Sequence, residues 1–170
     1  MTDNAGATAR AEDEASLVAL LNATWFGAGL EPETQVRLAR LARRYQAAAG
    51  TQLLGEGELT TELSIVVSGR VTLRTLVPER GSVPILTVEP GDVFGWSAVV
   101  EPFRATSTVV AQGPVDVLAL EAKGLRAALA TDCGLAVALY PRMLQALARR
   151  LSATRLQLLD LFAGEQGGTW

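Results

Sequence analysis

Apolar residues recur at helical spacing near the start of the chain. Residues 16–26 (SLVALLNATWF) are predicted to form an amphipathic helix, because apolar residues recur there at helical spacing: Leu17, Leu20, Leu21 and Trp25. Glu31-Pro32-Glu33 then suits the first turn of a second helix, where proline fits and acidic side chains face the positive end of the helix dipole. We expect this helix to continue to about residue 47 and to end before Gly50.

The middle of the chain changes to short runs of strand-forming residues separated by glycine and proline. Strands are predicted over 51–54, 63–68, 70–77, 83–88, 106–111 and 115–120. Ser68-Gly69 between two β-branched runs is a hairpin signal, and residues 78–82 (PERGS) are expected to be a solvated loop. Evenly spaced short strands are typical of a barrel or jelly roll, so the predicted fold class is mainly β with flanking helices.

Helical periodicity returns near Ala122. We predict a short helix over 122–130, followed by Thr131 or Asp132 as the cap of a further helix. In that helix an apolar seam recurs in steps of three and four, with one polar member: Val137, Tyr140, Leu144, Leu147, Leu151, Thr154, Leu158 and Leu161. Such a seam is typical of a coiled coil, and Pro141 near its start predicts a kink between a short and a longer helix.

The apolar seam has two possible uses. It can pair with the same helix of a second copy, or it can pack on the strands of its own chain. We favour a homodimer, because a single buried face does not need so narrow a stripe. The predicted organisation is therefore a disordered tail (1–15), entry helices with a β-roll (16–135), a dimerisation helix (136–163) and a second tail (164–170).

The composition narrows the possible functions. The chain of 170 residues contains no histidine, which excludes a histidine metal site, a serine–histidine triad and a histidine general base. Metal-dependent enzymes on a similar roll need histidines, so we expect no enzyme activity and no metal. The net charge of −3 does not suit nucleic-acid binding, and the cluster Arg37, Arg40, Arg43 and Arg44 is interpreted as a solvated helix face.

Three features of the sequence bear on the cellular compartment of the protein: its apolar runs, its N-terminus and its cysteine content. The longest uncharged apolar runs are shorter than the roughly 18 residues that a membrane span needs, and the polar N-terminus is unlike a secretory signal. One cysteine, Cys133, allows no internal disulfide, which suits a reducing compartment. We therefore expect a cytoplasmic protein without membrane contact.

The strongest candidate chemistry lies in residues 94–106 (FGWSAVVEPFRAT). A glycine lets backbone approach a ligand closely, and a short helix that begins after Gly95 would aim free N–H groups at an anion. Arg104 stands in an otherwise uncharged stretch and offers a forked donor pair to that anion. The alternative is a structural ion pair between Arg104 and Glu101 or Asp92.

These features, in this order, resemble a known family. Entry helices, then LSIVVSGRVTLR (63–74), LTVEPGDVFG (86–95) and the segment ending at Arg104, are similar to the cyclic nucleotide-binding domain of the catabolite activator (Crp/Fnr-like) family and of kinase regulatory subunits. The resemblance covers about residues 17–162. It implies a cyclic nucleotide-binding β-roll, a double-stranded jelly roll with N-terminal helices and a long C-terminal helix, whose ligand is cyclic AMP or cyclic GMP.

The resemblance also implies roles for particular residues. The phosphate cassette would comprise Phe94, Gly95, Trp96, Ser97, Ala98, Arg104, Ala105 and Thr106. Thr154 matches a threonine that activators place against the purine across the dimer, which makes it a possible lid. An equal alternative is that Thr154, the polar member of the seam, sets the register of the coiled coil.

Two features depart from the family pattern. The family has a glutamate directly after the glycine, which accepts the ribose 2′-hydroxyl, whereas this chain has Trp96, whose indole donates one hydrogen bond and accepts none. The stretch from Gly95 to Arg104 is also slightly short. Losing the acceptor should cost about 1.5–3 kcal/mol, or roughly tenfold to a hundredfold in affinity. Trp96 could fill the pocket, or it could form an apolar wall for a different anion.

The expected output follows from what the sequence contains. Activators continue into a DNA-reading helix-turn-helix, and no such segment follows in these 170 residues. We therefore expect a stand-alone regulatory or sensor module with a degenerate cassette. It would bind a cyclic nucleotide or other small anion weakly or not at all, and act through a dimer or a protein partner without direct DNA contact. The alternative is a scaffold subunit that binds no ligand and docks on another protein.

Overall fold

The computed structural model describes the backbone of residues 3–165 and the side chains of residues 13–156. Helices α1 (Asp3–Asn22) and α2 (Pro32–Ala39) come first, and α3 (Ala122–Thr131) and α4 (Cys133–Glu165) come last. Between them lie β1 (Ala42–Ala47), β2 (Gln52–Leu54), β3 (Glu62–Ser68), β4 (Val71–Val77), β5 (Gly81–Val88), β6 (Val93–Phe94), the 3₁₀ turn η1 (Trp96–Ala98), β7 (Thr108–Ala111) and β8 (Val115–Glu121).

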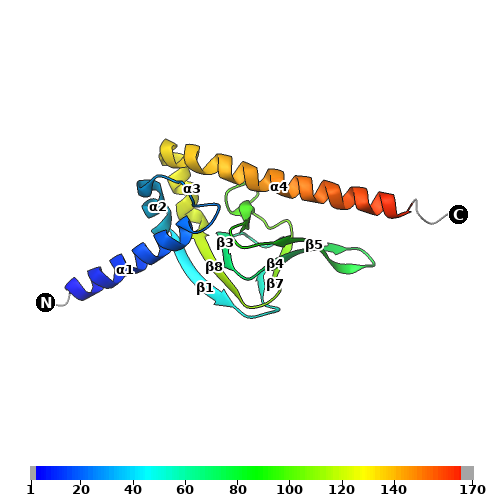
Figure 1. Ribbon diagram of the computed structural model, residues 1–170, viewed down its shortest axis with the longest axis horizontal. Coiled ribbons are helices and arrows are strands. Elements are labelled where there is room, and N and C mark those ends of the chain that lie inside the picture. The colour runs from blue at the N-terminus through cyan, green and yellow to red at the C-terminus, as the bar shows by residue number, and fades with distance from the viewer. Residues whose placement is uncertain (1–2, 166–170) are drawn as a thin grey trace.

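The strands form two antiparallel sheets of four, in the orders β1-β8-β3-β6 and β2-β7-β4-β5. The chain crosses from one sheet to the other at every connection except the one between β4 and β5, which gives the predicted jelly roll. The helices gather at one end of the strands, and α4 runs across the molecule and continues past them (Figure 1). The predicted fold class is therefore confirmed.

The buried side chains form two clusters, one on each face of the first sheet. Leu63 and Leu118 point to a cluster shared with the helices, whereas Val66 and Val117 point between the two sheets. Strand β8 is consequently buried along both faces, from Val115 to Leu120. This explains why the sequence of β8 reads as a nearly continuous apolar run rather than as an alternating one.

Two predicted boundaries at the N-terminal end require correction. The structure has helix from Asp3, where a tail over residues 1–15 was expected, and several alanines in this stretch favour helix despite its polar composition. The second helix ends at Ala39 rather than near residue 47, because residues 42–47 pair with β8 as strand β1. Pairing along a whole strand outweighs the weak helical preference of these residues.

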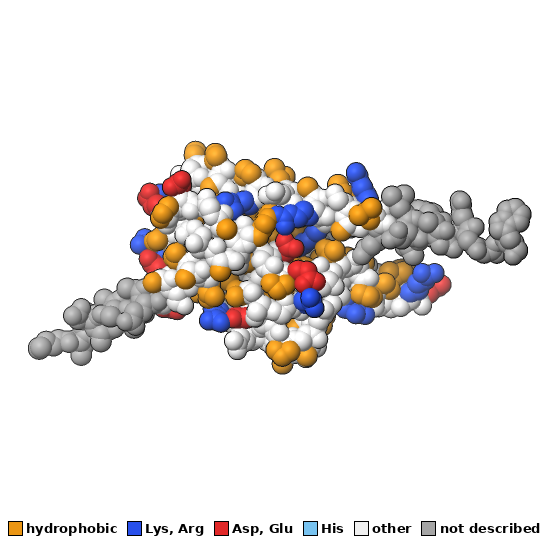
Figure 2. Space-filling view, in the orientation of Figure 1, with side chains coloured by type: hydrophobic (Ala, Val, Ile, Leu, Met, Phe, Trp, Pro, Cys, Tyr) orange, Lys and Arg blue, Asp and Glu red, His pale blue; other side chains and the backbone are white. Residues whose placement is uncertain are grey.

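The four arginines interpreted as one solvated helix face are in fact distributed over two elements. Arg37 lies on α2 and Arg40 caps it, while Arg43 and Arg44 lie on β1. Each has an acidic partner: Glu33 and Asp132 for Arg37, Glu14 for Arg40, Glu62 for Arg43 and Asp116 for Arg44. Their charges are thus locally balanced, and Figure 2 shows basic and acidic side chains interspersed over the visible face.

The hairpin predicted at Ser68-Gly69 is also corrected. Strand β3 belongs to the first sheet and β4 to the second, so the turn carries the chain from one sheet to the other. Gly69 has φ +79°, and a Cβ there would lie 2.3 Å from the carbonyl oxygen of Pro114. The glycine is needed for this crossing, and the sequence signal for a turn was right although its type was wrong.

Helix α4 differs from its prediction at Pro141. The helix runs from Cys133 to Glu165 through the proline, so the expected division into a short and a longer helix is wrong. Asp132 caps α4, as predicted, by accepting a hydrogen bond from the Leu135 amide at 3.0 Å. Among the described residues, no helix is both long and apolar enough to cross a membrane.

The two long faces of α4 have different surroundings. One stripe is buried against the chain's own core: Leu135, Leu139, Met143 and Ala146. The predicted seam faces outward, where four of its members are exposed: Val137, Tyr140, Leu144 and Leu151. Packing of this seam on the chain's own strands is therefore ruled out for these four residues. Apolar side chains are visible along the edge of the molecule that α4 follows in Figure 2.

Candidate ligand-binding site

The predicted cassette begins with a left-handed turn at the end of β6. Phe94 is buried between the sheets, and Gly95 follows with φ +72°. A Cβ at Gly95 would lie 2.6 Å from the carbonyl oxygen of Glu62, so only glycine fits this position. The backbone approach that the sequence predicted at Gly95 is thus present in the fold.

The turn after Gly95 is a single 3₁₀ turn. The Ala98 amide donates to the Gly95 carbonyl at 2.9 Å, and the Val99 amide donates to the Trp96 carbonyl at 3.1 Å. Arg126 of α3 donates to the Ala98 carbonyl at 2.6 Å and fixes the end of the turn. Ala98 itself is buried in the core beneath the helices, so it supports the turn and does not face a ligand.

Trp96 stands where the family pattern has a carboxylate. Its indole is partly buried and packs against the cluster shared with the helices. It also lines a hollow of about 20 Å³, which we call the inner hollow, with most of the other predicted cassette residues: Phe94, Gly95, Ser97, Ala105 and Thr106. A space of this size holds about one water molecule. The structure therefore brings most of the predicted cassette residues together, but the space they enclose is nearly filled.

Arg104 does not face the inner hollow. Ala105 is buried, and Arg104 beside it in an extended segment is exposed, because neighbouring side chains of such a segment point to opposite sides. The guanidinium donates to the Gly57 carbonyl at 2.8 Å. In the described part of the chain neither Glu101 nor Asp92 forms an ion pair with Arg104, so the predicted structural pair is not formed either.

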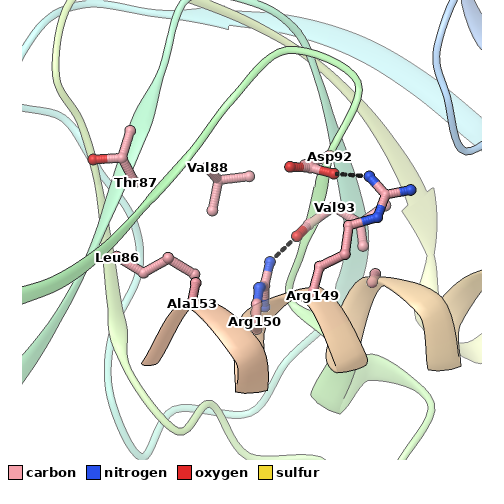
Figure 3. Close-up of a pocket in the computed structure, with 9 residues that line it drawn as sticks. Leu86, Thr87, Val88, Asp92, Val93, Arg149, Arg150 and Ala153 are labelled. Atoms are coloured by element: carbon pink, nitrogen blue, oxygen red, sulfur yellow. Dashed lines mark hydrogen bonds and ion pairs between the residues drawn. The ribbon is translucent and has the colours of Figure 1, made fainter. Parts of the chain in front are cut away.

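A larger hollow of about 190 Å³, which we call the outer hollow, lies between α4 and the end of β5 (Figure 3). Leu86, Thr87 and Val88 of β5 form one side of it, and Arg149, Arg150 and Ala153 of α4 form the other. Sequence reasoning missed the two arginines because it followed only the outward seam. Arg150 continues the inward stripe of Met143 and Ala146 at steps of three and four, a signal that could have placed it.

The two arginines of the outer hollow are held differently. Arg149 lies 3.4 Å from the carboxylate of Asp92, and its guanidinium stacks over the Trp25 ring at 3.8 Å from the ring centre. Arg150 donates to the backbone carbonyl of Val93. Burial lowers the pKa of Arg150 below its ordinary value, an effect that the nearby charge of Asp92 partly offsets. Arg150 remains charged at neutral pH, as arginine does in proteins.

The remaining predicted site residues lie on α4. The Thr154 hydroxyl is exposed and donates to the Arg150 carbonyl of its own helix at 2.9 Å. Both roles predicted for Thr154 need a second chain and stay predictions. Leu147 is partly buried, and the side chains of Leu158 and Leu161 lie outside the described residues.

The sequence model of the family described as "Cyclic nucleotide-binding domain" matches residues 44–132, which run from within β1 to the end of α3 and include the whole cassette. This chain therefore belongs to the cyclic nucleotide-binding domain family. The match confirms the resemblance inferred from the sequence.

Individual relatives agree with this assignment. A CRP-like cAMP-activated global transcriptional regulator of Mycobacterium tuberculosis is 28% identical over 133 residues, which are 78% of this chain and 58% of the relative. A cyclic nucleotide-binding domain from Methylobacillus flagellatus superposes with a TM-score of 0.74 at 23% identity, covering 88% of this chain and 84% of that one. A cAMP-binding acyltransferase from Mycobacterium smegmatis gives 0.61 at 27% identity, covering 75% and 40%. The chain thus spans little more than half of the regulator's length.

Proposed function

We propose that this domain is a regulatory sensor that binds a cyclic nucleotide or another small anion weakly, and that it passes the signal on through a dimer or a protein partner rather than through catalysis. The family supplies the ligand class, since two of the relatives above are named for cAMP. We expect the affinity for the ligand to be low, because Trp96 replaces the acceptor for the ribose hydroxyl and the inner hollow is nearly filled.

The observation that carries this proposal is the outer hollow, which lies directly beside the cassette. Val93 and Asp92, which lead into the cassette turn, form part of its wall, and two arginines face it from α4. Small-molecule sites are typically about 300–1,000 Å³, so a hollow of about 190 Å³ can cover part of a nucleotide but not all of it. Partial enclosure is consistent with weak binding.

The outward seam of α4 supports a homodimer as the output. Leu144 and Leu151 are 66% and 55% exposed, although both are large apolar residues on one face of a long helix. The same face of a second copy would cover them at coiled-coil spacing. Because α4 carries the arginines of the outer hollow on another face, ligand binding and dimer geometry share one helix.

Titration calorimetry with cyclic AMP and cyclic GMP tests the proposed function. We expect saturable binding, weaker than is usual for the family, and the Trp96→Glu variant to bind about tenfold more tightly because it restores a charged acceptor. Trp96→Ala is the matched control, because it opens the same space without supplying an acceptor. Absence of saturable binding by the wild-type protein would refute the sensor and favour the second candidate.

The second candidate is a scaffold subunit that binds no ligand. The filled inner hollow and the outward position of Arg104 favour it. In that case the roll would dock on another protein while α4 sets the stoichiometry. A partner that binds the wild type and an Arg150→Gln variant equally, with no effect of added cyclic nucleotide, would support this role.

A further inference from the structure

We propose that Ser82, on the hairpin formed by β4 and β5, is a phosphorylation site, and that Arg74 of the facing strand holds the phosphate group once it is attached. The modifying partner is a protein kinase, with a nucleoside triphosphate as the phosphate donor. This inference goes beyond the proposed function and does not depend on ligand binding, so each of the two can fail while the other stands.

The first argument is accessibility. Ser82 is exposed and is the second residue of β5, directly after the turn at residues 78–80. Strand β5 stands at the edge of its sheet, so one side of it has no neighbouring strand within the described residues. In Figure 1 the hairpin of β4 and β5 projects from the body of the roll. An exposed edge strand is open to a second protein, and a kinase can therefore reach the Ser82 hydroxyl.

The second argument is the position of Arg74. Its Nε donates to the Ser82 Oγ at 2.9 Å, and its Nη2 donates to the Ser82 carbonyl oxygen at 2.6 Å. Among the described residues, Ser82 is the only one whose side-chain hydroxyl accepts a hydrogen bond from an arginine. Phosphorylation would place acceptor oxygens beside this guanidinium, and such charge-assisted bonds are stronger than bonds between neutral groups.

The third argument is that Ser82 and the Glu56 carboxylate lie on opposite faces of the hairpin. In the sheet register Ser82 pairs with Leu76, the residue after Thr75, so the side chains of Ser82 and Thr75 point to opposite faces. Glu56 accepts a hydrogen bond from the Thr75 hydroxyl at 3.2 Å. A phosphate on Ser82 would therefore point away from Glu56, whereas a phosphate on Thr75 would meet this carboxylate.

The charges around Ser82 also suit a phosphate. The exposed turn before it carries one charge of each sign, Glu79 and Arg80, and Arg74 adds a further positive charge. In the described part of the chain, neither Arg74 nor Arg80 forms an ion pair with a carboxylate. Both arginines can therefore face a phosphate group, which carries a charge of about −1.5 to −2 at pH 7.

The proposed reaction is a phosphoryl transfer. The Ser82 Oγ forms a bond to the γ-phosphorus of the triphosphate, the bond from this phosphorus to the bridging oxygen breaks, and the nucleoside diphosphate leaves. The hydroxyl proton passes to the general base of the kinase. The Arg74 guanidinium would then donate to the phosphate oxygens, which ties β4 to β5 more firmly than the present bond to a neutral hydroxyl.

The first test uses the full chain with phosphoserine introduced at position 82 during synthesis, with and without the Arg74→Gln substitution. Phosphorus NMR across a pH series measures the second pKa of the phosphate. We expect this pKa to lie below its ordinary value of about 6 beside Arg74 and to return towards it in Arg74→Gln, because a guanidinium favours the dianion. Phosphothreonine introduced at position 75 is the matched control, and its pKa should rise because Glu56 faces it. Equal values with and without Arg74 would overturn the inference.

The second test measures whether a kinase modifies the folded protein. The full chain is incubated with ATP and a serine/threonine kinase that prefers arginine before its target, and mass spectrometry locates the phosphate. We expect phosphate on Ser82, none at this position in Ser82→Ala, and a severalfold lower rate in Arg80→Gln. Modification only at other hydroxyls, or none while the free peptide of residues 74–88 is modified, would overturn the inference. Neither outcome depends on whether the protein binds a cyclic nucleotide.

Discussion

The guanidinium of Arg150 donates a hydrogen bond to the carbonyl oxygen of Val93, so α4 is tied to the strand that leads into the cassette turn. An adjacent face of the same helix carries the exposed seam. A ligand in the outer hollow would lie against α4, so ligand binding would act directly on the helix that we propose as the dimer contact.

The first prediction concerns the left-handed glycines. Gly95→Ala should destabilise the protein by about 3 kcal/mol, because close contact with the Glu62 carbonyl adds to the cost of a positive φ. Gly81→Ala is the matched control, since Gly81 has nearly the same φ (+73°) and nothing within 4 Å of an added Cβ. It should cost only about 1 kcal/mol. Urea unfolding measures both, and equal losses would show that the turn at Gly95 is not closely packed.

The second prediction concerns the outward seam. Leu144→Glu should convert a dimer into a monomer, because it places charges opposite each other in the seam while leaving the core of each chain intact. Gln145→Glu adds the same charge at the next exposed position and should leave the dimer in place. Sedimentation equilibrium distinguishes the two states. A wild-type protein that is monomeric at micromolar concentration would remove the dimer from the proposed function.

The third prediction concerns the pair between Arg44 and Asp116. The Asp116 side chain is 8% exposed and accepts from Arg44 Nε at 2.9 Å, so Arg44→Ala leaves a buried carboxylate without its cation. We expect a loss of stability several times larger than that of Arg40→Ala, whose pair with Glu14 is exposed. Urea midpoints give the comparison, and similar losses would mean that water satisfies Asp116.

The fourth prediction concerns pH. The Leu135 amide and then the Arg37 guanidinium lower the pKa of Asp132 below its ordinary 3.8. A depressed carboxyl pKa stabilises the fold above the unfolded-state pKa, and this stabilisation is lost as the pH falls through the folded-state value. Asp132→Asn should therefore be less stable than the wild type at pH 7, and the difference should shrink as the pH falls below the ordinary pKa of the carboxyl and vanish below its folded-state pKa. Urea midpoints across this range measure it, and a difference that does not depend on pH would contradict this account.

Much of the fold could be predicted because its signals are local. Glycine and proline mark most strand boundaries, and the cap at Asp132 follows from one side chain and the next turn of backbone. Strand β1 could not be predicted, because its sequence ARRYQA has no clear alternation and its conformation depends on pairing with β8, about seventy residues away. The continuity of α4 through Pro141 likewise depends on packing that local rules do not include.

The candidate site could be predicted only in part, for a related reason. The cassette residues are adjacent in sequence, so the turn at Gly95 and the replacement at Trp96 were visible from the chain alone. The direction of Arg104 depends on which of its neighbours is buried, and Ala105 takes the inward position. Arg150 comes to the cassette only because α4 folds back over β6, a contact between residues far apart in sequence.

A crystal structure of the protein grown with cyclic AMP tests the central claim most directly. We expect difference density for a nucleotide in the outer hollow, beside the cassette turn at Gly95. No density under conditions that saturate binding in solution would contradict the claim.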